Sequence, residues 1–305
     1  LSNSSREAVN RVERLIGGSI LFFEGDVKDT FLLQNIFETY PIEGVIHFAG
    51  SKSVSESIVR PIRYYDNNVS STIALIEVML RFDCKKLVFS SSATVYGLPE
   101  SVPVKENFPL RAINPYGGSK LMVEQILRDV FLSDSSWRIA ILRYFNPVGA
   151  HHSGLIGEDP QGVPNNLMPY IMRVANGTYD KLEVFGGDYP THDGTGVRDY
   201  IHVVDLSRAH VKAFQALNGN AEVLTFNLGT GFGVSVLDMV SAFELVSGVS
   251  VPYEIVGRRE GDVSACYADT SYAAMKLGWK TEFGLEKMCE DSWRWQSLNP
   301  FGYLK

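Results

Sequence analysis

The chain is organised around Lys86-Leu87-Val88-Phe89-Ser90-Ser91-Ser92. Its first four residues are mostly apolar and typical of a short strand, and the three serines fall where such a strand ends. In an open sheet of parallel strands, ligands bind at the carboxyl ends of the strands. The stretch therefore predicts a buried strand that brings hydroxyl groups to a binding site.

A second stretch, Asn114-Pro115-Tyr116-Gly117-Gly118-Ser119-Lys120, predicts the start of a helix. Asn114 can cap a helix, and Pro115 suits the first helical position, where a missing N–H costs nothing. Apolar residues continue at roughly helical spacing at Leu121, Met122, Ile126 and Leu127. Tyr116 and Lys120 then lie one turn apart on the same face of the helix.

A phenol beside an ammonium group can transfer protons. Free tyrosine titrates near pH 10, and a neighbouring cation favours the phenolate, so we expect Lys120 to lower the pKa of Tyr116. Taken alone, a Tyr-x-x-x-Lys spacing occurs more often on an ordinary surface helix than in a catalytic pair. Ser92, at the end of the preceding strand, completes a Ser–Tyr–Lys set and favours the catalytic interpretation.

Strand and helix signals alternate through the first half of the chain. Short apolar runs typical of strands occur at residues 20–24, 45–50, 86–90 and 138–145. Apolar residues at helical spacing predict helices at residues 30–40 and 63–82. This alternation predicts an α/β fold with a doubly wound parallel sheet of the Rossmann type.

The composition changes at residues 151–166, which are rich in Gly, Pro, Asp and Asn and show little periodicity. We therefore expect residues 1–146 to form a dinucleotide-binding domain and residues 147–305 to form mainly a smaller α/β substrate domain. Two later segments, near residues 197–215 and 223–246, are expected to return to the large domain.

Overall composition narrows the class of protein. The chain has 305 residues, is 45% hydrophobic and carries a net charge of −7, so a core of about two domains is expected. The dispersed Lys and Arg residues argue against nucleic acid or a membrane surface as a partner, and no apolar run approaches membrane-spanning length. Cys84, Cys266 and Cys289 show no metal-ligand spacing, so we expect no metal site and a cytoplasmic location.

The stretch Phe89-Ser90-Ser91-Ser92-Ala93-Thr94-Val95-Tyr96-Gly97, taken with Asn114–Lys120, resembles the extended short-chain dehydrogenase/reductase family. Within that family it looks like the UDP-glucose (UDP-galactose) 4-epimerases, and the resemblance covers essentially the whole chain. It implies NAD as cofactor and UDP-galactose and UDP-glucose as substrates. It also implies a homodimer formed through the helices near residues 63–82 and 116–131.

The same resemblance implies roles for the Ser–Tyr–Lys set. Tyr116, as a phenolate, is expected to take the proton from the sugar O4 hydroxyl while NAD⁺ takes hydride from C4. Hydride then returns to the other face of the sugar. Lys120 is expected to orient the cofactor ribose and to lower the pKa of the phenol, and Ser92 to hydrogen-bond O4. Because the cofactor ends unchanged, it is expected to stay bound.

Further residues match positions that contact the cofactor in the resembling family. With Tyr116 and Lys120, the expected NAD-binding residues are Asn3, Ser4, Asp26, Val27, Phe48, Ala49, Gly50, Lys52, Asn67, Ser90 and Phe145. Lys52 is as consistent with a solvated loop lysine as with a phosphate contact. His47 is better explained as a paired, buried polar group than as a catalyst.

The resemblance implies a sugar-nucleotide site from residues along the whole chain. The expected members are Lys52, Ser92, Tyr116, Asn146, Asn166, Leu167, Phe185, Arg198, Tyr200, Arg259, Asp262 and Cys266. Arg198 and Arg259 can bind a diphosphate, which an acidic protein must meet with a local basic pocket. Phe185, taken alone, is better explained as a core residue, and Arg258 is better explained as a surface ion-pair partner.

Cys266 stands where some of these epimerases have tyrosine. The smaller side chain leaves room near the sugar C2 substituent. We therefore hypothesise that the N-acetylated sugars UDP-GlcNAc and UDP-GalNAc are also accepted.

A dinucleotide-binding fold is expected to open with a strand and a G-x-G-x-x-G loop. The stretch Gly229-Thr230-Gly231-Phe232-Gly233 follows a strand signal, but Val234 occupies the third glycine position, so a plain turn is favoured. In the resembling family, Leu1-Ser2-Asn3-Ser4 looks like the loop after the second strand, so the first βαβ segment is expected to be missing from this chain. A protein truly without it would bind cofactor weakly or not at all.

Two other functions are compatible with parts of the sequence. A sugar-nucleotide dehydratase needs an acid–base carboxylate pair beside the serine, and Ser92-Ala93-Thr94 offers none. A non-catalytic protein that binds NAD or a nucleotide sugar would account for the missing glycine loop. The presence of both Tyr116 and Lys120 argues against that alternative.

Overall fold

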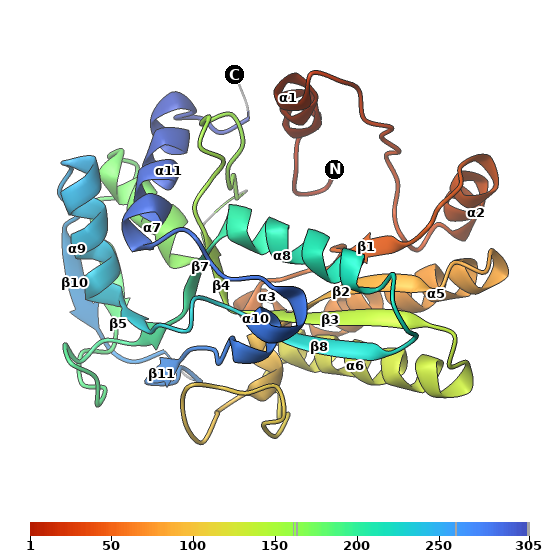
Figure 1. Cartoon of the computed structure of the whole chain (residues 1–305). Coiled ribbons are helices and arrows are strands. Elements are labelled where there is room, and N and C mark those ends of the chain that lie inside the picture. The colour runs from red at the N-terminus through yellow and green to blue at the C-terminus, as the bar shows by residue number, and fades with distance from the viewer. Residues whose placement is uncertain (161, 163, 260, 304–305) are drawn as a thin grey trace.

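The structure, a computed structural model, describes residues 1–160, 162, 164–259 and 261–303. At its centre lies a four-stranded sheet in the order β1-β2-β3-β8 (Figure 1). Its strands are β1 (Val45–His47), β2 (Lys86–Ser92), β3 (Arg138–Tyr144) and β8 (Val223–Leu228). All three pairings are parallel, which confirms the predicted α/β class with a Rossmann-like sheet.

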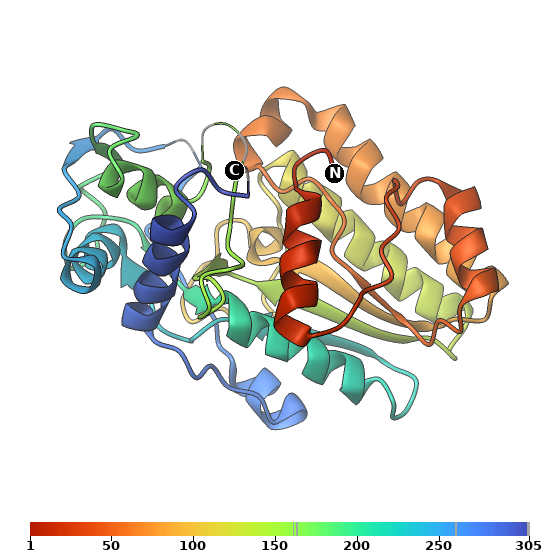
Figure 2. The same ribbon diagram turned by 90° about the horizontal axis from the view of Figure 1, so that it is seen from above.

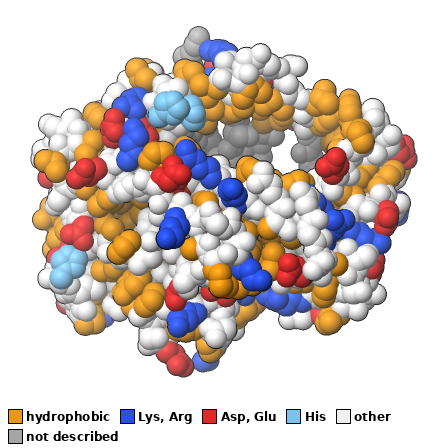
Figure 3. Space-filling model, in the orientation of Figure 1, with side chains coloured by type: hydrophobic (Ala, Val, Ile, Leu, Met, Phe, Trp, Pro, Cys, Tyr) orange, Lys and Arg blue, Asp and Glu red, His pale blue; other side chains and the backbone are white. Residues whose placement is uncertain are grey.

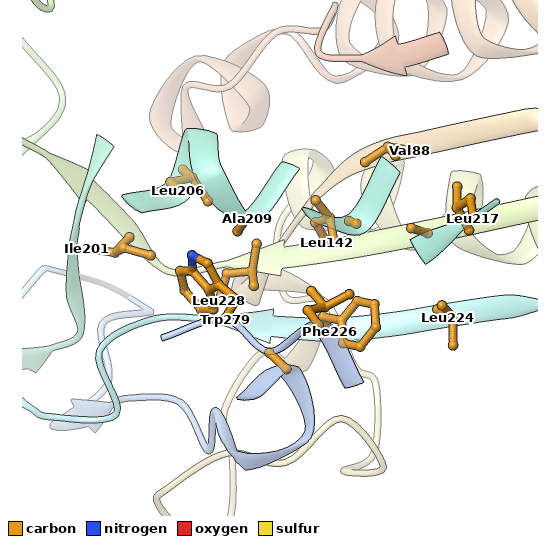
Figure 4. Close-up of a cluster of buried hydrophobic side chains, with 14 residues drawn as sticks. Val88, Leu142, Ile201, Leu206, Ala209, Leu217, Leu224, Phe226, Leu228 and Trp279 are labelled. Carbon is orange, nitrogen blue, oxygen red and sulfur yellow. The ribbon is translucent and has the colours of Figure 1, made fainter. Parts of the chain in front are cut away.

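Each face of the sheet carries its own apolar cluster, because alternate residues of a strand point to opposite faces. On one face, Leu87 and Phe89 pack with helices α5 (Ser71–Arg81) and α6 (Pro115–Ser133). On the other face, helix α8 (Val203–Ala216) covers the sheet. Figure 4 shows side chains of this second cluster, among them Val88, Leu142, Leu206, Ala209, Leu217 and Phe226. Burial from both sides explains why β2 has no alternating polar pattern.

The other elements surround this sheet. The further helices are α1 (Arg6–Ile16), α2 (Thr30–Thr39), α3 (Val54–Val59), α4 (Pro61–Tyr65), the π-helix η1 (Asp66–Ser70), the 3₁₀ helix η2 (Ala93–Tyr96), α7 (Leu167–Ala175), α9 (Val236–Ser247), α10 (Ser271–Leu277) and α11 (Leu285–Leu298). The further strands are β4 (Asn146–Val148), β5 (Leu182–Phe185), β6 (Val197–Arg198), β7 (Tyr200–His202), β9 (Val234–Ser235), β10 (Tyr253–Val256) and β11 (Ala265–Cys266).

A second packed unit, on the left in Figure 1, is built from α7, α9, α11 and the β5–β10 pair. Its core includes Met168, Ile171, Val184, Met239 and Phe243. The expectation that all of residues 223–246 return to the sheet is therefore wrong for α9. Strand β8 joins the sheet, but the apolar face of α9 fits the second core and packs on α11.

No strand forms at residues 20–24, where the sequence predicted one. Strand β1 pairs only with β2 in the described chain, and residues 20–24 do not pair with its other edge. An apolar cavity of about 470 Å³ lies beside β1 and is lined by residues such as Val27, Phe37, Ile46, Phe48 and Leu75. Figure 3 shows the surface hollowed in this part of the molecule, and positive and negative side chains interspersed over the same face.

The helix predicted at residues 63–82 is interrupted. Helix α4 ends at Tyr65, a π-helical turn follows, and α5 begins at Ser71. A π-turn inserts one extra residue per turn and is often found at functional sites. Here it turns the side chain of Asn68 inward, where it is buried.

The loop Gly229-Thr230-Gly231-Phe232-Gly233 wraps around the buried carboxylate of Asp199. The backbone N–H groups of Thr230 and Gly231 donate to it at 2.7 and 3.1 Å. A Cβ at Gly229 would lie 2.2 Å from Asp199 Oδ2, so this position requires glycine. The predicted turn is therefore confirmed, because an internal carboxylate takes the donors that a phosphate would need.

Helix α1 lies above the central sheet in the view of Figure 1 and near the C-terminal end of the chain in both views (Figures 1 and 2). Its Arg11 donates to Leu155 O at 3.1 Å and to Asn299 Oδ1 at 2.6 Å. This one side chain therefore links α1 to a loop of the middle of the chain and to the end of α11. Within the described chain, no helix combines the length and the apolar character that crossing a membrane requires.

Candidate active site

Strand β2 and helix α6 bring the Ser–Tyr–Lys set to one place. The side chain of Asn114 caps α6 by accepting from Gly117 N at 2.8 Å, as the sequence predicted. Ser92 ends β2, and its Oγ accepts hydrogen bonds from Thr94 N at 3.2 Å and from Thr94 Oγ1 at 3.0 Å. Ser92 also lies near the phenol of Tyr116, and it acts against the rise in the pKa of that phenol.

Lys120 is buried between α6 and the end of β2. Its Nζ donates to Ser90 O at 2.8 Å and lies 5.0 Å from the centre of the Phe89 ring. Burial lowers the pKa of Lys120 to about 8. The ammonium group has two further N–H donors without a partner in the described residues, so it can bind another acceptor.

The expectation that Lys120 lowers the pKa of Tyr116 is not met in this structure. Burial raises the pKa of Tyr116, because the phenolate is poorly solvated there, and the nearby hydroxyl of Ser92 only partly offsets this. The amine of Lys120 is directed to the strand carbonyl of Ser90 instead of to the phenol. Tyr116 therefore needs an additional positive charge to ionise near neutral pH.

Tyr144 is a site residue that the sequence analysis missed. Its hydroxyl hydrogen-bonds Ser90 Oγ, and its backbone is paired in register with Ser92. Burial raises the pKa of Tyr144 to about 12; Ser90 acts against this and the nearby Tyr116 adds to it. Its position in the sequence, at the end of a predicted strand and directly before the predicted site residue Phe145, could have indicated this role.

The loop after β1 approaches α6 closely. Asn68 holds it by accepting from Ser51 N at 2.7 Å and by donating to Ser119 Oγ at 2.9 Å. A Cβ at Gly50 would lie 3.1 Å from Asn68 Oδ1 and 3.5 Å from Lys120 Nζ. Asn67, the predicted contact, donates to Ser51 Oγ at 3.0 Å, whereas the neighbouring Asn68 was missed.

Other predicted cofactor residues are less closely joined. Phe48 is exposed and lies 4.6 Å from the ring of His210, and Ala49 lines the same cavity beside β1. Lys52 forms an exposed ion pair with Glu158 at 3.1 Å, and Asn166 donates to the same carboxylate. This is the solvated state that the sequence analysis left open for Lys52.

The remaining predicted cofactor residues come from the N-terminal part of the chain and from the end of β3. Asn3 and Ser4 are exposed ahead of α1, and Asp26 is exposed in a turn that it closes through Lys28 N at 2.9 Å. The structure shows no hydrogen bond from these three to the rest of the predicted site, within the described chain. Val27 lines the cavity beside β1, and Phe145 is buried after β3.

A second group of predicted residues meets around strands β6 and β11. Arg198 donates to Asp262 Oδ1 at 3.1 Å and is paired in register with Cys266. The guanidinium of Arg259 lies 4.2 Å from the centre of the Phe185 ring. Arg258 forms an exposed ion pair with Asp188, the alternative that was expected for it.

Three more residues of the predicted substrate site lie in β4, α7 and β7. Asn146 is exposed in β4, Leu167 begins α7 and is half-buried, and Tyr200 is buried in β7. Burial raises the pKa of Tyr200 to about 12, so this phenol stays protonated.

Away from this site, His192, Asp193 and Asp238 gather with ligand atoms within 4.8 Å of one another. No metal site is expected from the sequence, and no spacing in it indicates this cluster. Both carboxylates already have local partners: Asp193 accepts from Thr195 N, and Asp238 caps α9. The cluster is therefore explained as a set of loop and helix caps.

The lowered pKa of Lys120 makes a pH prediction. Unfolded lysine titrates near 10.5 and folded Lys120 near 8, so the unfolded state binds more protons between these values. The unfolding free energy of the wild type should therefore rise from pH 8 to pH 10.5, relative to Lys120→Met, by about 3 kcal/mol. Urea unfolding across this range measures it.

The exposed Lys212 of α8 provides the matched control, Lys212→Met, which should follow the wild type over the same pH range. An unfolding free energy of Lys120→Met that stays parallel to that of the wild type over this pH range would contradict the lowered pKa of the buried lysine.

Comparison with known proteins places this site in a family. The family model for GDP-mannose 4,6 dehydratase matches residues 1–292. The UDP-glucose 4-epimerase of Bacillus subtilis is 57% identical over 303 residues, which cover 99% of this chain and 89% of that protein. The human UDP-glucose 4-epimerase is 53% identical over 298 residues, covering 97% of this chain and 86% of that protein.

Solved structures agree. The UDP-glucose 4-epimerase from Bifidobacterium longum, in complex with NAD⁺ and UDP, has a TM-score of 0.95 and 52% identity, and the match covers 98% of this chain and 90% of that one. The enzyme from Stenotrophomonas maltophila, with NAD and formylated UDP-arabinopyranose, has a TM-score of 0.97 and 49% identity, with 98% and 89% covered. The chain therefore belongs to the family that the dehydratase model describes and, within it, to the UDP-glucose 4-epimerases of the extended short-chain dehydrogenase/reductase family.

Proposed function

We propose that the protein is an NAD-dependent UDP-glucose 4-epimerase that interconverts UDP-galactose and UDP-glucose. The observation that carries this proposal is the meeting of Ser92, Tyr116 and Lys120 at the carboxyl end of β2. This is the chemistry that removal and return of a hydroxyl proton requires. The relatives named UDP-glucose 4-epimerase, up to 57% identical, support the same substrates.

The residues around Lys120 fit a nicotinamide cofactor. The absence of a side chain at Gly50 leaves room beside the amine, and Lys120 retains free N–H donors. We assign the cofactor site to the Phe48–Gly50 loop with Lys52, Asn67, Ser90, Tyr116, Lys120 and Phe145, and its far end to Asn3, Ser4, Asp26 and Val27. When bound, NAD supplies the oxidation and reduction at sugar C4.

Tyr116 acts as the acid and base in this proposal. As a phenolate it accepts the proton of the sugar O4 hydroxyl, and as a phenol it returns that proton. Ser92 hydrogen-bonds both the phenol and O4, which shortens the path of the proton. Burial raises the pKa of Tyr116 and Lys120 donates to Ser90 O, so the further positive charge that favours the phenolate would come from the nicotinamide of bound NAD.

The second group of residues binds the nucleotide in this proposal. Arg198 and Arg259 bind the diphosphate, together with Asn166 and Leu167 at the start of α7. Asp262 accepts from ribose hydroxyls, and Phe185 lies along the base. Asn146, Tyr200 and Lys52 complete the site. Fixing the nucleotide half leaves the sugar free to turn over between proton removal and return.

A dehydratase is the other activity suggested by the name of the family model. The segment after Ser92 is Ala93-Thr94, which provides no carboxylate pair for elimination of water. The sequence after Ser92 thus favours the epimerase, in agreement with the names of the relatives.

We also propose a division of labour between the two packed units. Residues 1–146, with residues 197–215 and β8, form the cofactor-binding unit, and residues 147–305 otherwise form mainly the nucleotide-sugar unit. The separate apolar cores support this division. A cytoplasmic location is proposed because all three cysteines carry free thiols.

The activity test uses the purified protein with NAD and UDP-galactose, and a coupled assay for UDP-glucose. Tyr116→Phe removes the group that exchanges the proton, so turnover should fall by at least about 10²-fold. Exposed Tyr253 on β10 provides the control, and Tyr253→Phe should leave turnover unchanged. Failure of the wild type to form UDP-glucose would favour a non-catalytic binding protein.

The half-buried Cys266 is proposed to leave room for a C2 acetamido group. Cys266→Tyr should fill this space and lower turnover of UDP-GlcNAc by at least about tenfold, with a much smaller effect on UDP-glucose. Cys266→Ser should retain both activities. If the wild type epimerises UDP-glucose but not UDP-GlcNAc, the proposed role of Cys266 is wrong.

A homodimer is proposed through the outer face of α4, α5 and α6. Exposed apolar side chains follow this face at Ile62, Ile73, Leu80 and Met122, and a groove of about 340 Å³ lies between Ile62 and Met122. Met122→Glu should shift the protein to a monomer in sedimentation velocity. Val211→Glu, on the exposed side of α8, is the control and should not; a monomeric wild type would refute this interface.

A further inference from the structure

A row of polar side chains crosses the sheet on the face covered by α6. The backbone register places Ser91 of β2 beside Arg143 of β3, and Arg143 beside Asn227 of β8. All three side chains are buried, and so is Glu124 of α6, which lies over them. The row is therefore a fully desolvated polar network directly behind the residue that ends β2.

Glu124 joins two elements of the site. It accepts from Arg143 Nε at 2.9 Å and from Arg143 Nη2 at 2.5 Å, a bidentate pair. Its Oε1 also accepts from Ser91 Oγ at 2.6 Å. Ser91 directly precedes Ser92, and Glu124 lies one turn after Lys120 on α6. The carboxylate thus links the strand that carries Ser92 to the helix that carries Tyr116.

Arg143 joins a third element. Its Nη1 donates to the Tyr96 hydroxyl at 2.9 Å and to Glu106 O at 3.0 Å, and Tyr96 donates to Asn227 Oδ1 at 2.7 Å. Tyr96 ends η2, the short helix that begins directly after Ser92. Ser91, directly before Ser92, is hydrogen-bonded to Glu124, and Tyr96, four residues after Ser92, is hydrogen-bonded to Arg143. The Arg143–Glu124 ion pair therefore holds the chain on both sides of Ser92.

We propose that the Arg143–Glu124 ion pair is a positioning element that sets the distance between the Ser92 hydroxyl and the Tyr116 phenol. The proposal rests on the proposed epimerase function. An apolar replacement of a buried ion pair is often neutral or stabilising, so stability alone does not explain such a pair. Its bidentate geometry instead fixes β2, η2 and α6 relative to one another.

The first test compares Glu124→Gln with the wild type. Glutamine has the same shape but loses the charge that holds Arg143, so Ser92 and Tyr116 should lose their alignment. The kcat for UDP-galactose should fall at least tenfold, while KM, set by the distant nucleotide contacts, should stay within about twofold. Ser91→Ala, which removes one link to Glu124, should give a smaller loss of kcat.

The second readout is the pH dependence of kcat. The ionisable groups around Tyr116 and Lys120 are Tyr144 on β3 and His47 on β1, and Arg128 lies 3.9 Å from Glu124. The nearby hydroxyl of Ser92 acts to lower the pKa of Tyr116, so its displacement should raise this pKa further. In the plot of kcat against pH, the part that rises with pH should therefore move to higher pH in Glu124→Gln. It should stay in place in the control variant Asp291→Asn.

Asp291 of α11 provides the matched control. It is a buried carboxylate that is paired with His202, Lys287 and Arg294 in the other packed unit. Asp291→Asn should lower stability in a comparable way and leave kcat and its pH dependence unchanged. Equal loss of kcat in both variants, or an unchanged kcat in Glu124→Gln, would overturn the positioning role.

A turnover-independent measurement separates this inference from the proposed function. Ultraviolet difference titration against Tyr116→Phe isolates the ionisation of Tyr116, and this pKa should be higher in Glu124→Gln than in the wild type. An inactive wild type that shows this shift would refute the epimerase function but retain the positioning role. An active wild type without the shift in Glu124→Gln would do the reverse.

Discussion

The hydrogen bond from Lys120 Nζ to Ser90 O, 2.8 Å long, is the interaction on which the site depends. It holds a buried cation at the carboxyl end of β2 and fixes α6 against that strand. Tyr116, one turn earlier on α6, is thereby placed at the strand end where Ser92 lies. Because Lys120 is almost completely desolvated, its position cannot relax into solvent, and the geometry of the phenol follows from it.

Around this contact, the apolar and the polar residues of the sheet have different structural roles. Its apolar rows bury β2 on both faces and make the strand a rigid support. Its polar row, Ser91–Arg143–Asn227, joins the strand to α6 and η2 instead of to the solvent. The end of β2 is therefore held in place by the Arg143–Glu124 network and by apolar packing on both faces of the sheet. Asn68 holds the loop after β1 against α6 by accepting from Ser51 N and donating to Ser119 Oγ.

The parts of this structure that sequence reasoning predicted are those with local causes. The cap at Asn114 and the buried run of β2 depend on neighbouring residues only. The strand expected at residues 20–24 was wrong because a strand needs a paired neighbour, which a local pattern does not reveal. The raised pKa of Tyr116 was also missed, because it results from burial by elements distant in sequence. Asn68 was missed because a π-turn shifts which of two adjacent asparagines faces inward.

The central claim is that Tyr116 and Ser92 jointly handle the proton of the sugar O4 hydroxyl beside the cofactor. A crystal structure of the protein with NAD and UDP-glucose tests it most directly. The account predicts that O4 lies within about 3 Å of both the Tyr116 phenol oxygen and Ser92 Oγ. A bound sugar whose O4 faces away from Tyr116 would contradict it.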